Sequence, residues 1–169
     1  MPAIRILIVD DSLVIRRVLA DALSRDSAIE VVGSAADGTI ALSKIPLLKP
    51  DVVTLDIEMP GMSGLETVVA IRKLYPHLPV IMFSTLTERG ATSTLEALSL
   101  GASDYVTKPS NTSSLEETRS RIQQELIPKV KALCKRRDLV TRLCPHRFLP
   151  ARSSEVESIL NNHEPAALT

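Results

Sequence analysis

Phe, Trp and Tyr are scarce in this sequence. There is no Trp, and two Tyr and two Phe are the only such residues among 169, although 44% of the residues are hydrophobic. The core is therefore expected to be aliphatic, as it is in parallel sheets that helices cover on both faces. No stretch reaches the roughly 20 consecutive apolar residues of a membrane span, and the N-terminal residues lack the apolar region of a signal peptide. We therefore expect a cytoplasmic protein without a membrane partner.

Cysteine is also scarce, and glycine is missing from the last part of the chain. Cys134 and Cys144 form no C-x-x-C pair, so we expect reduced thiols. No glycine follows Gly101, and the residues after 127 show no strand pattern. The net charge is zero, but the first part of the chain is acidic and the last part is basic. This predicts a globular domain over residues 1–127 and a basic, partly disordered linker or tail over residues 128–169.

Within residues 1–127, short apolar segments alternate with amphipathic segments. The apolar segments predict five strands, at residues 4–9, 29–35, 52–55, 80–83 and 105–106. Helices are expected over residues 13–23, from 38 to before 50, over 64–75, up to about 100, and from 115 onward. Arg16 and Arg17 fall on the solvent side of the first helix, and Pro128 should end or kink the last one. The alternation predicts a flavodoxin-like α/β fold, a doubly wound five-stranded parallel sheet with helices on both faces; its strand order, 2-1-3-4-5, is assigned by analogy.

Polar residues stand at the carboxyl ends of four of these strands. They are Asp10 and Asp11 after the first strand, Asp56 after the third, Ser84 after the fourth and Lys108 after the fifth. In a sheet of this order those ends meet at one edge, where ligands bind. Crowded carboxylates favour a hard divalent cation such as Mg²⁺. A carboxylate can also accept a phosphoryl group, with a lysine and a hydroxyl stabilising the phosphoryl oxygens.

Each of these signals has an ordinary structural explanation when it is taken alone. Asp10, Asp11 and Ser12 could simply cap the following helix. Lys108 could be a solvated surface lysine, and Ser84 an ordinary hydroxyl at the end of a strand. Because all five residues follow the correct strands in order, we interpret them as one site, with Asp56 as the nucleophile and Asp10 and Asp11 as metal ligands.

Four segments resemble the response-regulator receiver family, and the resemblance covers about residues 1–127. They are ILIVDDS at 6–12, PDVVTLDIEMP at 50–60, PVIMFS at 79–84 and KP at 108–109. The resemblance implies that a histidine kinase phosphorylates Asp56. It also implies that Mg²⁺ is bound by Asp11, Asp56 and the backbone carbonyl of Glu58, with Asp10 helping through water. Ser84 and Tyr105 would form a switch pair that changes the face made by the fourth helix, the fifth strand and the fifth helix.

Residues 84–90, 94–98 and 101–109 are similar to the receiver half of the chemotaxis protein-glutamate methylesterases of the CheB family. In that family a serine-hydrolase domain follows a linker. A nucleophile elbow needs glycines around its serine, and none follows Gly101. We therefore expect no esterase domain in this chain, which would act as a receiver and would control a methylesterase or deamidase output domain in a longer parent protein. The alternative is a stand-alone response regulator that acts through protein–protein contacts.

Three other functions fit the sequence less well. A phosphatase of the haloacid dehalogenase type needs two aspartates separated by one residue, whereas Asp10 and Asp11 are adjacent. Esterase activity with His77, His146 or His163 as the base lacks a glycine-flanked serine. The basic tail could attract nucleic acid. It contains no recognition motif, so we expect a solvated helix extension and linker. Its basic residues are Lys129, Lys131, Lys135, Arg136, Arg137 and Arg142. Cys144 and His146 alone would not make a metal site.

Overall fold

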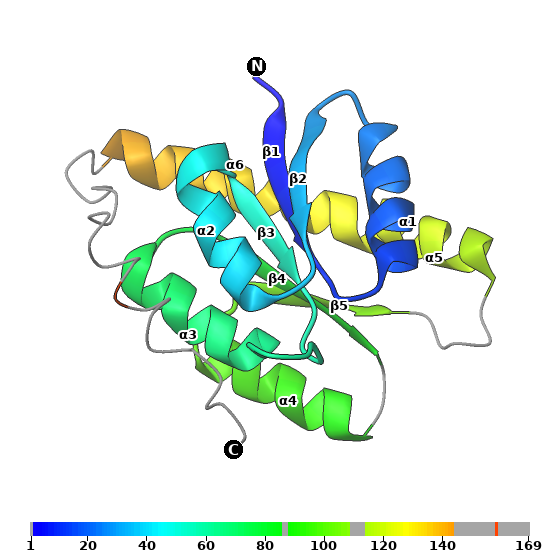
Figure 1. Ribbon diagram of the computed structural model, residues 1–169. Helices are drawn as coiled ribbons and strands as arrows, with labels where there is room; N and C mark the ends of the chain where they lie inside the picture. Colours follow the sequence, from blue (N-terminus) through cyan, green and yellow to red (C-terminus); the bar gives the residue numbers. More distant parts are fainter. Residues whose placement is uncertain (1, 86–87, 109–113, 144–157, 159–169) are drawn as a thin grey trace.

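The computed structural model describes residues 2–85, 88–108, 114–143 and 158 (Figure 1). Its centre is a parallel five-stranded sheet in the order β2-β1-β3-β4-β5, as predicted. The strands are β1 Ile4–Val9, β2 Ile29–Ala35, β3 Val52–Leu55, β4 Val80–Thr85 and β5 Asp104–Lys108. The bounds of the first three agree with the sequence prediction. β4 and β5 are longer than predicted, because polar residues also pair in them, Ser84 with Thr107 and Thr85 with Lys108.

Helices cover both faces of the sheet. α2 Gly38–Leu48, α3 Gly64–Leu74 and α4 Glu88–Ser99 lie on one side in Figure 1, and α1 Leu13–Ser24 and α5 Leu115–Arg121 lie on the other. Successive side chains of a strand point to opposite faces, so Leu7 and Val9 of β1 join the core on the α2 side. Ile6 and Ile8 join the core on the α1 side. The sheet therefore separates two aliphatic cores.

Side-chain caps fix where several helices begin. Ser63 accepts the N–H of Glu66, and the Glu66 carboxylate accepts the N–H of Ser63, so the two residues form a capping box. Ser114 likewise accepts the N–H of Glu117 at the start of α5. At the other end of α4, Gly101 has a φ of 113°, a conformation that favours glycine. Gly101 therefore lies just beyond the end of α4, which the sequence placed at about residue 100.

Pro128 does not end the last helix, which was one of the two outcomes predicted for it. A π-helical turn, η1 Ile122–Leu126, follows α5, and α6 Ile127–Leu143 continues from it. In this wider turn the N–H of Ile127 bonds to the carbonyl of Ile122, five residues earlier. Proline lacks an N–H, and its ring would clash with a carbonyl of the preceding turn in a regular helix. A wide turn just before Pro128 relieves that conflict, because π-turns change the spacing of the helical carbonyls.

Helix α6 is docked on the domain rather than separate from it. Val130 and Cys134 are buried in the core on the α1 side. Three ion pairs join α6 to three different parts of the domain, and they are Lys129–Asp104, Lys131–Asp26 and Arg137–Asp51. The predicted boundary after residue 127 remains a prediction, but part of the expected tail packs on the sheet. Cys144, His146, His163 and the rest of the predicted tail beyond residue 143, except Ser158, lie outside the described residues, as does the side chain of Arg142.

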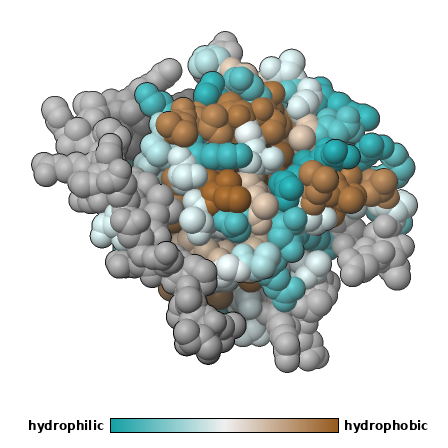
Figure 2. All heavy atoms as spheres, in the orientation of Figure 1, coloured by the Kyte–Doolittle hydropathy of each residue, from teal (hydrophilic) through white to brown (hydrophobic). Residues whose placement is uncertain are grey.

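The surface of the described residues is of mixed character. Figure 2 shows hydrophobic side chains in separate groups among hydrophilic ones on the face that it presents. None of the helices in the described ranges is long and apolar enough to cross a membrane.

Candidate functional site

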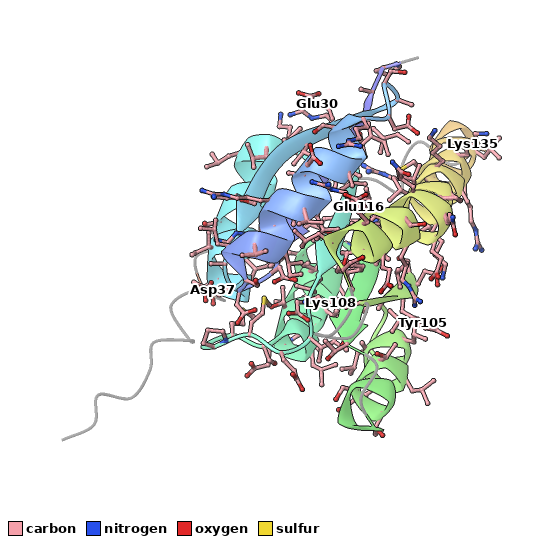
Figure 3. The ribbon with its side chains drawn as sticks, turned by 90° about the vertical axis from the view of Figure 1, so that its right-hand side faces the viewer. Glu30, Asp37, Tyr105, Lys108, Glu116 and Lys135 are labelled. Atoms are coloured by element: carbon pink, nitrogen blue, oxygen red, sulfur yellow. The ribbon has the colours of Figure 1, made fainter. Side chains whose placement is uncertain are left out.

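The carboxyl ends of β1, β3 and β5 bring the predicted site residues together. Parallel pairing sets Val9 opposite Leu55, so Asp10 and Asp56 follow at the same edge of the sheet. The N–H of Asp56 donates to the carbonyl of Val9 at 2.9 Å, which joins the two strand ends directly. Lys108 ends β5 and lies at the same end of the sheet as Asp37, away from Glu30 at the start of β2 (Figure 3).

Lys108 forms a buried ion pair with two of the acids. Its Nζ lies 2.6 Å from Asp10 Oδ2 and 2.7 Å from Asp56 Oδ2. All three residues are buried. Buried charges are tolerated only when they are paired and hydrogen-bonded, and the remaining oxygens also have donors. Asp10 Oδ1 accepts the N–H of Ser12, and Asp56 Oδ1 accepts the N–H of Ile57. Both carboxylates are therefore held in fixed orientations.

Asp11 completes an acidic cluster with these two residues. Asp10, Asp11 and Asp56 each offer one carboxylate oxygen, and these oxygens all lie within 4.8 Å of one another. Asp11 is exposed, so the cluster opens to solvent on its side. Three carboxylates face a single lysine, which leaves an excess of negative charge. Oxygen ligands that converge at a partly hydrated opening are the donor set that suits Mg²⁺, so the residues present fit that ion.

Burial has a strong effect on the titration of Asp56. It raises the pKa of this carboxyl from its ordinary 3.8 to about 6, even though the charge and hydrogen bond of Lys108 act in the opposite direction. The cause is the loss of water around the charged form, and the negative charge of Asp10 adds to it. A second positive charge in the cluster would therefore favour the ionised form, which is the form that can act as a nucleophile.

Ser84 and Tyr105, predicted as a switch pair, lie in different environments. Ser84 is buried in β4. Tyr105 is 44% exposed and lies at the surface in Figure 3. The Nζ of Lys129, from α6, lies 5.1 Å from the centre of the Tyr105 ring and donates to the Tyr105 carbonyl and to Asp104 Oδ1. Glu58 is exposed, and its predicted role as a carbonyl ligand stays a prediction.

Sequence reasoning missed the contacts of two basic residues, Arg16 beside the acidic cluster and Lys129 at the start of β5. Arg16 was expected on the solvent side of its helix, but its Nη1 donates to the backbone carbonyls of Asp10 and Asp11. Lys129 was assigned to the linker, whereas it contacts Tyr105. No sequence signal marked either contact, because an arginine or lysine on a polar helix face is usually solvated.

The comparisons with known proteins agree with this geometry. Residues 6–120 match the response regulator receiver domain. The chain therefore belongs to the response regulator receiver family. Among solved structures it is similar to the response regulator domain of CheB from Thermotoga maritima, with a TM-score of 0.70 and 45% identity over 79% of this chain and 97% of that chain. It is also similar to the CheX–CheY–BeF3–Mg²⁺ complex from Borrelia burgdorferi, with a TM-score of 0.60 and 29% identity over 72% of this chain and 88% of that chain.

Curated relatives carry the resemblance to CheB proteins further. The chain is 53% identical over 144 residues to a protein-glutamate methylesterase/protein-glutamine glutaminase of Trichodesmium erythraeum, covering 85% of this chain and 41% of that protein. It is 55% identical over 139 residues to the protein of the same name from a Nocardioides species, covering 82% of this chain and 38% of that protein. The chain thus spans about two fifths of the length of these relatives and aligns with their receiver part. The predicted CheB-like character of the receiver is confirmed.

Proposed function

We propose that this chain is a phosphoaccepting receiver in a two-component chemotaxis phosphorelay, and that Asp56 takes the phosphoryl group from a histidine kinase. The observation that carries the proposal is the position of Asp56. Its carboxylate contacts Lys108 Nζ at 2.7 Å and shares an acidic cluster with Asp10 and Asp11. A nucleophile, a cation and a metal-ligand set are thereby gathered at the end of the sheet where ligands bind.

In the proposed reaction a carboxylate oxygen of Asp56 attacks the phosphorus atom of the donor. A new P–O bond forms, the bond from phosphorus to the donor's leaving group breaks, and an acyl phosphate results. Lys108 exchanges part of its contact with the carboxylate for a phosphoryl oxygen, and the hydroxyl of Ser84 donates to another. Asp10, Asp11, Asp56 and the Glu58 carbonyl would hold Mg²⁺, which when bound neutralises negative charge on the phosphoryl oxygens.

The signal would then reach the surface formed by α4, β5 and α5. Once Ser84 turns toward the phosphoryl group, the Tyr105 ring moves inward behind it. That movement gives up the contact between the ring and Lys129 Nζ, so helix α6 would also be affected. In a longer parent protein this surface would control a methylesterase or deamidase output domain. Such a change is a local charge event that shifts the balance between two surface states.

The test is intact-mass analysis after incubation with acetyl phosphate and Mg²⁺. We expect one added phosphoryl group on the wild-type chain and none on Asp56→Asn. Glu30→Gln is the matched control, because Glu30 is an exposed acid on β2 that pairs with Arg5 far from the cluster. It should be phosphorylated like the wild type. Equal phosphorylation of the wild type and Asp56→Asn would show that the phosphoacceptor is a different residue.

A further inference from the structure

Arg16 makes two contacts with the backbone of the acidic cluster. It lies in the first turns of α1, and its Nη1 donates to the carbonyl of Asp10 at 2.6 Å and to the carbonyl of Asp11 at 2.9 Å. Both carbonyls belong to residues whose carboxylates form the cluster with Asp56. One guanidinium nitrogen therefore ties together the two residues of the turn between β1 and α1 that supply acids.

This contact matters most for Asp11. The Asp10 carboxylate is held directly by Lys108 and by the N–H of Ser12. Across the described part of the chain, by contrast, no hydrogen bond or ion pair is made by the Asp11 carboxylate, which is exposed. Its place in the cluster is therefore set by its backbone, and the Arg16 contact restrains that backbone at its carbonyl.

We propose that Arg16 is a positioning residue, which fixes the turn so that Asp11 and Asp10 together present their carboxylates to a divalent cation. The inference rests on the proposed function, in which this cluster binds Mg²⁺. The charge of Arg16 taken alone would act in the opposite sense, because a nearby positive charge repels a cation. Removing the Arg16 side chain should therefore weaken Mg²⁺ binding if its role is to position the turn, and should strengthen Mg²⁺ binding if only its charge matters.

The experiment compares the Mg²⁺ dissociation constants of wild type, Arg16→Met and Arg17→Met, measured from backbone amide NMR shifts during titration with MgCl₂. Arg17 is the matched control because it is the next residue of α1, and it is exposed. Residues that orient metal ligands typically change affinity about 10-fold or more when they are lost. We expect a weakening of about 10-fold in Arg16→Met and an unchanged or slightly tighter constant in Arg17→Met.

Urea unfolding in EDTA shows whether each variant is folded. If Arg16→Met does not fold, the Mg²⁺ dissociation constant of Arg16→Gln is compared with that of the wild type instead, because the shorter Gln side chain does not reach both carbonyls. An Mg²⁺ affinity equal to or tighter than that of the wild type in the folded Arg16 variant would overturn the inference, as would an equal loss in Arg17→Met. Absence of Mg²⁺ binding by the wild type would instead contradict the metal-dependent part of the proposed function.

Discussion

Replacing Asp56 by Asn should stabilise the metal-free protein, and the gain should grow with pH. Burial raises the pKa of Asp56 from 3.8 to about 6 in the folded chain. The folded state therefore holds a proton over a range of pH in which the unfolded state has lost it. Stability falls as pH rises wherever the folded state binds more protons. The wild type should thus lose stability between about pH 4 and about pH 6 through this group, and Asp56→Asn should not.

The size of this difference in unfolding free energy follows from the shift in the pKa of Asp56. A change of about two pKa units corresponds to about 3 kcal/mol of unfolding free energy. Asp56 is only 6% exposed, so solvent screening reduces this figure little. We expect Asp56→Asn to gain most of this figure of about 3 kcal/mol over the wild type between about pH 4, where the wild-type carboxyl is protonated in the folded state and only partly protonated in the unfolded state, and about pH 7.

Urea unfolding followed by circular dichroism in EDTA, at intervals between about pH 4 and about pH 8, measures this difference. Other groups titrate in the same range, but those outside the cluster are common to both proteins and cancel in the comparison. Glu30→Gln should keep the pH profile of the wild type. A difference between the wild type and Asp56→Asn that stays constant with pH would refute the assignment of a raised pKa to Asp56.

Two further substitutions test the packing around the site. A Cβ on Gly64 would meet the carbonyl oxygen of Asp56 and lie 2.7 Å from Ile57 Cα. Gly64→Ala should therefore destabilise the fold by about 2 kcal/mol and slow phosphorylation by acetyl phosphate. A melting temperature equal to that of the wild type would contradict the close approach. The buried hydroxyl of Thr54 has no hydrogen-bond partner among the described residues. The isosteric Thr54→Val should therefore raise the unfolding free energy by about 1 kcal/mol in urea titrations. A loss of stability would indicate a partner for that hydroxyl.

Most of the sheet could be predicted because the aliphatic segments are short and sharply bounded. The predicted bounds of β1, β2 and β3 agree with the structure, since a charged or turn-forming residue lies within two positions of each end of these segments. β4 was predicted two residues too short, because Ser84 and Thr85 are polar and their pairing with β5 is not encoded in hydrophobicity. The acidic cluster could be predicted for a topological reason, because parallel strands deliver their last residues to one edge.

The contacts of Arg16 and of α6 could not be predicted in the same way. Periodicity assigns Arg16 to a helix face, but whether its guanidinium reaches the carbonyls of Asp10 and Asp11 depends on the path of the turn before the helix. Pro128 is a local signal to end a helix. Burial of Val130 and Cys134 against the sheet outweighs that signal, and a π-turn before the proline makes the continuation possible.

The charge of the cluster connects its titration with its proposed need for a cation. Asp10, Asp11 and Asp56 outnumber Lys108, and two of these acids are buried. Burial is the main reason why the folded chain holds a proton on Asp56 at a higher pH than the unfolded chain, and the charge of Asp10 adds to it while Lys108 opposes it. A phosphoryl group would add further negative charge at the same place. A divalent cation would replace that proton and leave the Asp56 carboxylate free to attack. The pH dependence of stability and the proposed dependence of phosphorylation on Mg²⁺ therefore both depend on the cost of keeping the Asp56 carboxylate charged in a buried site.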